Sequence, residues 1–566
     1  MVAIVSLCDV YFSYKDIELK ALDGINLEID SGEVVIIMGP SGSGKSTLCS
    51  TLNGLIPHLI KGDLQGDITI DGIKTAKQKV KEFAPIIGLV FQDFEGQLFC
   101  SNVELEAAFG PENLGLPREE IKRRVDESLR FVRLDGFERR QPSTLSGGQK
   151  QRLAIASVLS LNPKILCLDE PTTDLDPIGK REIFAITKEL HNLEVQTIII
   201  VEHETEEILN SDRIVLMDKG RIKDIGPAHD ILKRVSLLKS LGIMPLQVTE
   251  LFYDLGFPKL PLTLKEALEI MRENDWSLSL AAYKSLLIED EKRIERLGEI
   301  TIDIQNLTYS YDGEKPALKE VTLSIREGEF VAIVGQNGSG KTTLVKHLNG
   351  LIMPTSGDVY INQKNTKEED IYSLSIDVGY VFQNPDHQIF AQSVADEVGF
   401  GLKIKGISEH KAKRMVEEAL YAVGLIDFED EDPFVLTKGQ RQRIAVASVM
   451  ASKPRVIILD EPTTGLDHKE LRGMMKLIKE LNQRGHTIII VTHTMWVVAE
   501  YAKRVVVMGG GRVIMDGPTR EVFSKEEELR ALFLKTPAIV SLGNRLGYTT
   551  LSIEEFKGCI EKKRDQ

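Results

Sequence analysis

Two glycine-rich loops constrain the fold of this chain more than any other feature. They are Gly39-Pro40-Ser41-Gly42-Ser43-Gly44-Lys45-Ser46 and Gly335-Gln336-Asn337-Gly338-Ser339-Gly340-Lys341-Thr342. Each follows an apolar run and leads into a helical pattern, so each is expected to join a buried strand to a helix. At such a junction several backbone N–H groups point to one place, where the helix dipole favours negative charge. Each loop is therefore predicted to hold a phosphate group.

The residue types in these loops fit a nucleotide and Mg²⁺. Glycine is needed because the backbone must come close to the ligand and adopt dihedral angles that other residues avoid. Lys45 and Lys341 are placed to reach the β- and γ-phosphates, and the hydroxyls of Ser46 and Thr342 to bind Mg²⁺. One such pattern can arise by chance, whereas two copies in the same setting make the interpretation strong.

Composition indicates a multidomain globular chain. The 566 residues are 42% apolar and 27% charged, with a net charge of −15, and the length is too great for one core. The acidic balance argues against nucleic acid as the main partner, because Lys and Arg hold phosphate backbones. No apolar run is long enough to span a bilayer, and the N-terminus lacks a signal-peptide pattern. Neither a disulfide framework nor a metal cluster is indicated by the scattered cysteines, Cys8, Cys49, Cys100, Cys167 and Cys559.

The chain contains two copies of one unit. Corresponding residues, such as Lys45 and Lys341 or His203 and His493, are separated by 290 to 296 positions, as duplication would produce. Alternating strands and helices predict a mostly parallel sheet covered on both faces. The expected domains are residues 1–240, a helical appendix and linker at 241–299, the second copy at 300–530, and a C-terminal helical appendix at 531–566.

The linker is expected to be helical rather than a flexible tether. It lacks a Gly/Ser run, and its Leu-rich stretches are typical of amphipathic helices. Part of it, from Pro245 to Gly256, resembles the C-terminal stretch from Pro537 to Gly547. Each copy thus carries a small appendix, which either contacts another unit or a partner, or packs on its parent domain.

A further motif identifies the kind of nucleotide machine. Leu145-Ser146-Gly147-Gly148-Gln149 stands 23 residues before Asp169, and Leu436-Thr437-Lys438-Gly439-Gln440 stands 23 before Asp460. Here the chain resembles the ATP-binding-cassette (ABC) ATPases, whose signature is Leu-Ser-Gly-Gly-Gln, over almost all of both copies. The resemblance implies an α/β fold of two P-loop nucleotide-binding domains in tandem, the first and second cassettes. Each would have an antiparallel β subdomain, a helical subdomain and a small helical C-terminal appendix.

In that family two cassettes pair head to tail, and the signature of one closes over ATP held by the loop of the other. A hydroxyl and glycine N–H groups at a helix N-terminus would form this second phosphate nest. The expected cofactors are ATP and Mg²⁺, and two cassettes in one chain supply a complete intramolecular pair. The nucleotide-binding residues implied by the resemblance are the two loops with Thr47 and Thr343, together with Ser146, Gly147, Gly148, Gln149, Thr437, Lys438, Gly439 and Gln440.

Carboxylates and a histidine follow the buried strands of each copy. Asp169 and Asp460 end apolar strands, where a carboxylate can bind Mg²⁺ directly or through water. The next residues, Glu170 and Glu461, are placed to polarise the attacking water as general base. By resemblance, His203 and His493 are switch histidines that contact the γ-phosphate, and Gln92 and Gln383 touch Mg²⁺ and the γ-phosphate.

Aromatic and interface positions also follow the family pattern. Tyr14 and Tyr311 lie where the family stacks an aromatic ring on adenine, although Tyr11 or Tyr309 could be the stacker, or these tyrosines could simply pack in a strand. Two short segments resemble the loop that couples the two sites, namely Asp174-Leu175-Asp176 and Gly465-Leu466-Asp467.

Lys438 departs from the pattern, because it replaces the first signature glycine. That signature would face the site of Lys45, while the site of Lys341 would receive the intact Ser146 signature. Both cassettes keep their glutamate and histidine. We therefore expect two hydrolytically competent but unequal sites.

The segments after Gln92 and Gln383 point to a transport role. Phe91-Gln92-Asp93-Phe94-Glu95-Gly96-Gln97-Leu98-Phe99 and Phe382-Gln383-Asn384-Pro385-Asp386-His387-Gln388-Ile389-Phe390 resemble the energy-coupling-factor ATPases, which drive import of vitamins and of cobalt or nickel ions. The resemblance implies a transmembrane coupling subunit, a substrate-binding membrane subunit and a peripheral place on the cytoplasmic face of the cell membrane. In that family a helix of the coupling subunit, carrying an essential arginine, lies in the adjoining groove. Its acidic partners, unless these carboxylates are merely solvated, would be Asp93, Glu95, Asp386 and Asp396.

The competing function is a twin-cassette ABC protein acting in translation or DNA repair. Translation factors of this kind join their halves by a basic helical linker, whereas residues 227–299 carry ten basic and twelve acidic side chains. Repair members insert zinc modules or coiled coils, and no paired cysteines are present. A third possibility is a conventional importer with a dedicated binding protein, which differs from the energy-coupling-factor type only in its partner.

Overall fold

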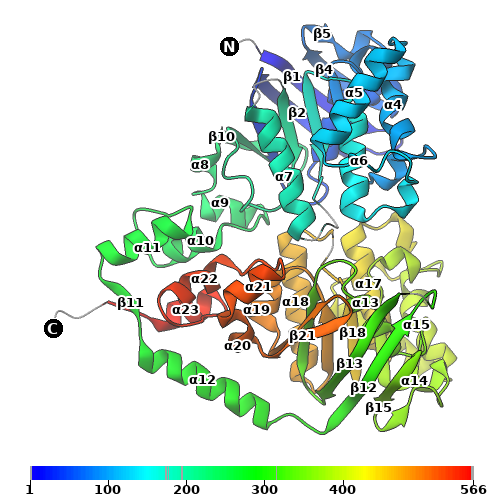
Figure 1. Ribbon diagram of the computed structural model, residues 1–566, viewed down its shortest axis with the longest axis vertical. Coiled ribbons are helices and arrows are strands. Elements are labelled where there is room, and N and C mark those ends of the chain that lie inside the picture. Colours follow the sequence, from blue (N-terminus) through cyan, green and yellow to red (C-terminus); the bar gives the residue numbers. More distant parts are fainter. Residues whose placement is uncertain are drawn as a thin grey trace. The chain divides into compact units, whose positions relative to one another are not determined.

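The computed structural model describes residues 3–172, 175, 177–192, 196–313, 315–463 and 465–562. Its contacts divide the chain into two compact units, Met1–Glu250 and Leu251–Gln566. Each unit contains one cassette, and the strands of the two cassettes follow the same order along the chain (Figure 1).

The first unit is built on two sheets. The antiparallel sheet has the order β2-β1-β4-β5, and the larger sheet has the order β10-β9-β3-β8-β7-β6. Within the larger sheet β6, β7, β8, β3 and β9 are parallel, and β10 pairs antiparallel with β9. The strands are β1 (Ala3–Tyr14), β2 (Lys20–Asp30), β3 (Val34–Met38), β4 (Gly62–Ile70), β5 (Ile73–Lys74), β6 (Ile87–Val90), β7 (Ile165–Asp169), β8 (Thr197–Val201), β9 (Arg213–Asp218) and β10 (Arg221–Pro227).

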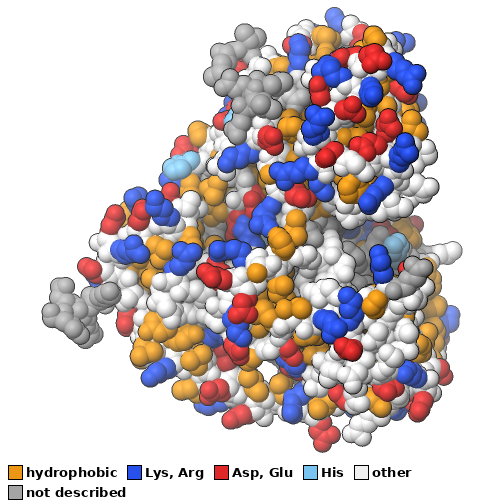
Figure 2. Space-filling model, in the orientation of Figure 1, with side chains coloured by type: hydrophobic (Ala, Val, Ile, Leu, Met, Phe, Trp, Pro, Cys, Tyr) orange, Lys and Arg blue, Asp and Glu red, His pale blue; other side chains and the backbone are white. Residues whose placement is uncertain are grey.

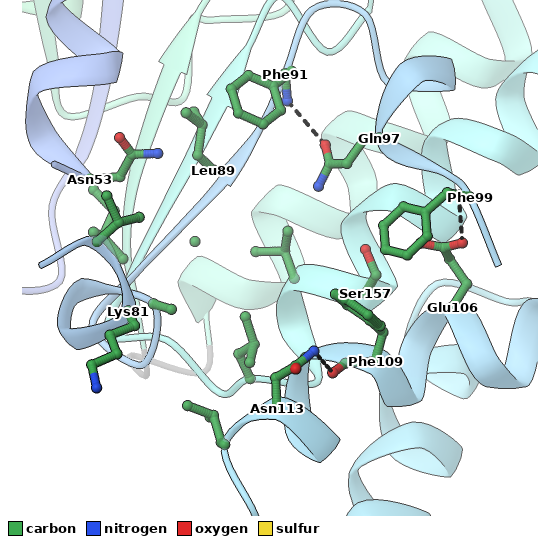
Figure 3. Close-up of a pocket in the computed structure, with 18 residues that line it drawn as sticks. Asn53, Lys81, Leu89, Phe91, Gln97, Phe99, Glu106, Phe109, Asn113 and Ser157 are labelled. Carbon is green, nitrogen blue, oxygen red and sulfur yellow. Dashed lines mark hydrogen bonds between the residues drawn. The ribbon is translucent and has the colours of Figure 1, made fainter. Parts of the chain in front are cut away.

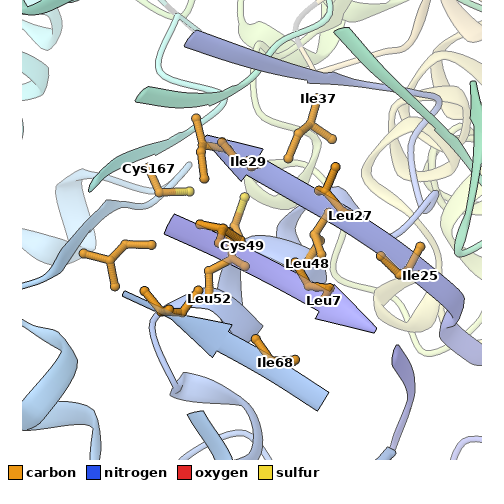
Figure 4. Close-up of a cluster of buried hydrophobic side chains, with 14 of the residues drawn as sticks. Leu7, Ile25, Leu27, Ile29, Ile37, Leu48, Cys49, Leu52, Ile68 and Cys167 are labelled. Atoms are coloured by element: carbon orange, nitrogen blue, oxygen red, sulfur yellow. The ribbon is translucent and has the colours of Figure 1, made fainter. Parts of the chain in front are cut away.

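The core of the first unit joins these two sheets through helix α1. The strands β3, β7 and β8 are buried at every residue, as expected for parallel strands covered on both faces. Figure 4 shows Leu7, Ile25 and Leu27 of the antiparallel sheet in one buried cluster with Leu48 and Leu52 of α1. The phosphate loop leaves β3 and enters α1, so this core fixes its position.

Two helices of the first cassette begin at residues whose side chains cap them. Asn102 accepts a hydrogen bond from the Leu105 N–H at the start of α4, and Ser146 forms a capping box at the start of α6. The helices are α1 (Lys45–Leu52), α2 (Leu55–His58), α3 (Val80–Phe83), α4 (Val103–Asn113), α5 (Arg118–Phe131), α6 (Gly147–Leu159), α7 (Pro177–Asn192), α8 (Ala228–Ile231), α9 (Val235–Ser240) and α10 (Gln247–Asp254), with short 3-10 turns that include η2 (Glu95–Gln97).

The second unit repeats this architecture. Its sheets have the orders β13-β12-β15-β16 and β17-β18-β19-β14-β20-β21, the second being parallel except for β21. The strands are β12 (Ile300–Ser310), β13 (Pro316–Arg326), β14 (Phe330–Gly335), β15 (Ser356–Ile361), β16 (Lys364–Asn365), β17 (Val378–Val381), β18 (Val456–Asp460), β19 (Thr487–Val491), β20 (Arg504–Gly509) and β21 (Arg512–Pro518). The predicted α/β fold, with its antiparallel sheet and largely parallel sheet, is thus present twice.

Most helices of the second cassette match those of the first in order, although the described residues between β8 and β9 form no helix like Met495–Tyr501, and those before β15 form no helix like α2. The helices of the second cassette are α13 (Lys341–His347), α14 (Ile371–Asp377), α15 (Val394–Ile404), α16 (Glu409–Ala422), α17 (Lys438–Ala451), α18 (His468–Gln483), α19 (Met495–Tyr501), α20 (Thr519–Ser524) and α21 (Glu526–Ala531), with the turn η4 (Pro385–His387). Thr437 forms a capping box at the start of α17, as Ser146 does for α6.

The linker appendix packs against the C-terminal appendix within the second unit. β11 pairs antiparallel with β22, the rings of Tyr283 and Tyr548 lie 4.9 Å apart, and Arg520 forms an ion pair with Asp290. The elements involved are α11 (Leu264–Glu273), β11 (Trp276–Leu278), α12 (Leu280–Glu295), α22 (Ala538–Arg545), α23 (Ile553–Cys559) and β22 (Ile560–Lys562).

Surface charge and helix length bear on possible partners. On the face shown in Figure 2, basic and acidic side chains are interspersed among the described residues, without an extended basic surface of the kind that nucleic-acid binders use. Within the described ranges, each helix is too short or too polar to cross a bilayer.

Candidate functional site

The two phosphate loops have the same geometry. Gly44 and Gly340 each adopt φ near 100°, in the left-handed region that favours glycine. At Gly39 a Cβ atom would lie 2.2 Å from the carbonyl oxygen of Met217, so only glycine fits there. The ammonium group of Lys45 donates to the carbonyls of Gly39 (3.0 Å) and Pro40 (2.9 Å). Lys341 makes the matching bonds in the second cassette.

A hydroxyl and a carboxylate meet beside each loop. Thr342 Oγ1 donates to Asp460 Oδ1 at 3.2 Å, and Ser46 bonds to Asp169 in the first cassette. Burial raises the pKa of Asp169 to about 6 and also raises the pKa of Asp460. Among the described residues, Oδ1 of buried Asp169 has no hydrogen-bond partner. Buried carboxylate oxygens of this kind fit Mg²⁺ as ligands, because the bound cation would offset the cost of ionising a buried carboxylate.

The proposed general bases lie against the proposed switch histidines. His203 Nε2 is 2.7 Å from Glu170 Oε1, and His493 Nε2 is 2.9 Å from Glu461 Oε1. The φ angles of Glu170 and Glu461 are 49° and 51°, a strained region for a non-glycine residue that is often found at functional sites.

Gln92 joins the same cluster. Its Nε2 donates to Glu170 Oε2 at 2.6 Å, so Glu170 contacts both the predicted sensor glutamine and the predicted switch histidine. Gln383 occupies the corresponding, exposed position in the second cassette. The strand order places β3, β8 and β7 next to one another, which brings the residues at their carboxyl ends together.

The two signatures share their capping but differ in their surroundings. Ser146 and Thr437 each accept a hydrogen bond from the N–H of the signature glutamine, Gln149 or Gln440. A Cβ at Gly147 would meet no described atom within 4 Å. By contrast, the Lys438 side chain lies about 3.1 Å from where a Cβ of Gly465 would stand. In the second cassette the predicted signature therefore lies against Gly465 of its own predicted coupling loop.

Other predicted residues are placed as follows. The hydroxyl of Tyr14 lies 2.8 Å from Thr47 Oγ1, and that of Tyr311 lies 3.1 Å from Thr343 Oγ1, so both rings lie beside the loops. Gly148 and Gly439 sit in the first turns of α6 and α17. Two residues of the predicted coupling loop in the first cassette, Asp174 and Asp176, lie outside the described residues.

The acidic side chains expected to meet a partner already have contacts within the chain. Glu95 forms an ion pair with Lys150 at 2.8 Å, and Asp386 forms one with Arg441 at 2.6 Å. Asp93 accepts from the N–H of Gly96, and Asp396 accepts from the Ser393 hydroxyl.

A groove adjoins each glutamine segment. The first, of about 380 Å³, lies between β6, α3, α4 and α6, with Phe91, Gln97, Phe99 and Phe109 in its wall (Figure 3). Phe99 is 63% exposed and meets Phe109 edge to face at 4.7 Å. Buried Glu106 holds the wall by accepting from the N–H groups of Phe99 and Cys100.

The second cassette repeats this groove. It has a volume of about 340 Å³, and Phe390 and Phe400 meet edge to face at 4.6 Å. Glu397 accepts from the N–H groups of Phe390 and Ala391. Each groove thus presents two exposed aromatic rings on a wall fixed by a buried carboxylate.

Comparison with known proteins agrees with this geometry. A family model described as ABC transporter matches residues 22–173 and 318–464, which together are more than half of the chain. The chain belongs to the ABC transporter family. It carries two ABC ATPase domains in tandem, and ATP binding and hydrolysis follow from that membership.

Relatives of this ABC protein match nearly its whole length. A protein of Caldanaerobacter subterraneus subsp. tengcongensis, named as an ABC transporter ATP-binding protein, is 53% identical over 98% of both chains. One from Methanosarcina mazei with the same description is 41% identical over 94% of this chain and 92% of its own. Among solved structures, CbiO1 of Clostridium perfringens, described as part of the ABC transporter complex CbiONQ, is 38% identical and covers 43% of this chain and 97% of its own, with a TM-score of 0.38.

The sequence motifs did not indicate two residues that lie beside the ATPase sites. Tyr380 on β17 donates its hydroxyl hydrogen to Asp460 Oδ2 at 2.7 Å, whereas the first cassette has Leu89 at this place. Glu202, next to His203, is buried and accepts from Thr172, whereas the second cassette has Thr492 there. Position-by-position comparison of the two copies would have revealed both differences.

Proposed function

We propose that this ABC ATPase is the energy-coupling subunit of an energy-coupling-factor importer. ATP and Mg²⁺ would bind at two composite sites formed by head-to-tail pairing of the cassettes, with the residues described above in their predicted roles. Closure and hydrolysis would drive solute uptake through a transmembrane coupling subunit and a substrate-binding membrane subunit at the cytoplasmic face of the membrane.

The paired grooves are the observation that carries this proposal. Each groove wall contains residues within seven positions of the predicted sensor glutamine, such as Phe91 directly before Gln92, and Gln97 and Phe99 after it. A partner segment in the groove would therefore contact the segment that responds to the γ-phosphate. Exposed aromatic rings in a groove suit the apolar face of an amphipathic helix.

The alternative, a twin-cassette protein of translation or DNA repair, has less support. The linker that would bind nucleic acid is slightly acidic. Its appendix elements also pair with those of the C-terminal appendix through β11 and β22, which leaves that stretch committed to contacts within the chain.

Crosslinking from the grooves tests the proposal. A photoreactive amino acid replaces Phe99 or Phe390 in the full-length chain, expressed in its native host, and crosslinked peptides are identified by mass spectrometry. We expect crosslinks to cytoplasmic segments of polytopic membrane proteins from both positions. Tyr421, 78% exposed on α16 and outside the groove linings, is the matched control. Crosslinks to ribosomal proteins or DNA-bound proteins would instead support the alternative.

A further inference from the structure

Each cassette ties its glutamine segment to its own signature helix through an ion pair. Glu95 of η2 binds Lys150 of α6. In the second cassette, Asp386 of η4 binds Arg441 of α17 through two contacts, at 2.6 and 3.3 Å. Lys150 and Arg441 are only 19% and 18% exposed at their side chains. The cations are thus held in place, while the more exposed carboxylates lie on the glutamine segment.

The pair has the same position in both cassettes although its residues differ. Glu95 and Asp386 are each the third residue after the sensor glutamine, and Lys150 and Arg441 each follow the signature glutamine. Both members have changed between the copies, from Glu and Lys to Asp and Arg, while the opposite charges and the contact remain. What the two copies share is therefore the ionic link rather than a particular side-chain shape.

The link reaches the signature itself. Arg441 Nη1 donates to the carbonyl of Leu436 at 2.5 Å, immediately before Thr437. Gln388 adds contacts from the glutamine segment to the same helix, at the Ala445 carbonyl and the Ser448 hydroxyl. Displacing the segment that contains Asp386 would therefore displace the N-terminal turn of α17.

The other end of the link reaches the hydrolysis site. Gln92 donates to Glu170, and three residues later Glu95 binds Lys150, one turn into the helix that Ser146 caps. In the first cassette a continuous set of contacts thus runs from the general base to the signature. If the cassettes pair head to tail, Glu170 serves the ATP site of Lys45, whereas the Ser146 signature serves the ATP site of Lys341.

We propose that the Glu95–Lys150 and Asp386–Arg441 ion pairs couple the two ATP sites. This inference rests on the proposed head-to-tail function. ATP at the site of Lys45 repositions Gln92, and the ion pair passes the displacement to the Ser146 signature, which serves the site of Lys341. The Asp386–Arg441 pair carries the reciprocal signal. Lys150 and Arg441 are positioning residues, because they act through the signature rather than on ATP.

Isosteric neutralisation of the carboxylates tests the coupling. In the full-length protein, Glu95→Gln and Asp386→Asn are combined, and ATP hydrolysis is followed over a wide range of Mg-ATP concentrations. We expect wild-type hydrolysis to be cooperative, with a Hill coefficient above one. In the double variant the Hill coefficient should fall to one and the coupling between sites should drop roughly fivefold or more. Exposed ion pairs contribute little to stability, so the fold should persist.

The internal duplication supplies the rescue and the control. Exchanging the second pair for the first, by Asp386→Glu with Arg441→Lys, should retain cooperativity, and so should Glu95→Asp with Lys150→Arg. Glu127→Gln, which breaks the surface pair between Arg123 and Glu127 on α5, is the matched control and should leave the curve unchanged. Because each exchange keeps the opposite charges and changes only the side chains, retained cooperativity would assign the coupling to the ionic contact.

Two negative outcomes are distinguishable. Cooperative wild-type hydrolysis with an unchanged Hill coefficient in the double variant would overturn the coupling inference alone. Small-angle X-ray scattering of the Glu170→Gln/Glu461→Gln protein should show compaction with Mg-ATP. Failure of that compaction, together with non-cooperative wild-type hydrolysis, would overturn the head-to-tail function and the inference with it.

Discussion

The Thr172 hydroxyl bonds both carboxylate oxygens of Glu202, at 2.8 and 3.0 Å. Thr172 follows the proposed general base by two residues, and Glu202 precedes the proposed switch histidine, so this contact joins the two catalytic segments of the first cassette. In the second cassette Thr463 and Thr492 make the corresponding contact between hydroxyl groups at 3.1 Å. The first cassette thus has a buried acid where the second has a neutral side chain.

Glu202 should make the stability of the first cassette depend on pH. Burial, with a smaller contribution from Glu204, raises the pKa of Glu202 to about 7 from an ordinary 4.5. Because the folded state holds this proton more tightly, stability falls as pH rises from about 4.5 to 7. Above pH 7, Glu202→Gln should raise the free energy of unfolding of the first cassette by about 3 kcal/mol. Near pH 4.5 the substitution should change this free energy little. Hydrogen exchange of the β8 amides at pH 5 and pH 8 measures this difference, and equal effects at both pH values would contradict it.

The general-base prediction concerns Glu170 and Glu461. Each lies beside its histidine at the end of a buried strand, where loss of a general base costs about 100-fold or more in rate. We expect the double variant Glu170→Gln/Glu461→Gln to lose at least this much phosphate release while still binding ATP. The single variants should lose unequal amounts, since only one site would receive the Lys438 signature. Equal losses would count against unequal sites.

Tyr380 should tune Mg²⁺ binding in the second cassette. Its hydroxyl donates a hydrogen bond to Asp460 Oδ2, and Thr342 donates one to Oδ1. Tyr380 therefore orients the carboxylate. Removing such an orienting group usually weakens metal affinity 10- to 100-fold. In a Glu170→Gln background, Tyr380→Phe should raise the Mg²⁺ concentration for half-maximal hydrolysis by about tenfold. Tyr360→Phe, on β15 away from Asp460, is the control; an identical Mg²⁺ dependence in the two variants would refute the orienting role.

Sequence alone predicted the fold and the residues at strand ends because motifs record local geometry. Asp169 ends the buried strand β7, and Lys45 and His203 follow the buried strands β3 and β8. These strands lie side by side in one sheet, so their ends converge. The strand–loop–helix junctions at Gly44 and Gly340 follow from the need for positive φ.

Contacts between distant elements could not be predicted in this way. The Glu95–Lys150 pair depends on how η2 packs on α6, and the Tyr380–Asp460 bond depends on neighbouring strands in register. No motif specifies which side chain fills such a position. The sequence likewise did not show that a carboxylate expected to face a partner has a contact within its own cassette, as Asp386 has with Arg441.

Lys438 should affect only one ATP site. Under head-to-tail pairing it belongs to the signature over the site of Lys45, whose general base is Glu170. Losing its ammonium group should weaken attraction for the triphosphate by up to about 1 kcal/mol, or roughly fivefold. In a Glu461→Gln background, where Glu170 alone supports hydrolysis, Lys438→Gly should therefore raise the apparent KM for ATP about fivefold. In a Glu170→Gln background the same substitution should change KM little, because that site uses the Ser146 signature. Equal changes in both backgrounds would show that Lys438 acts through the stability of its own cassette, where it packs on Gly465.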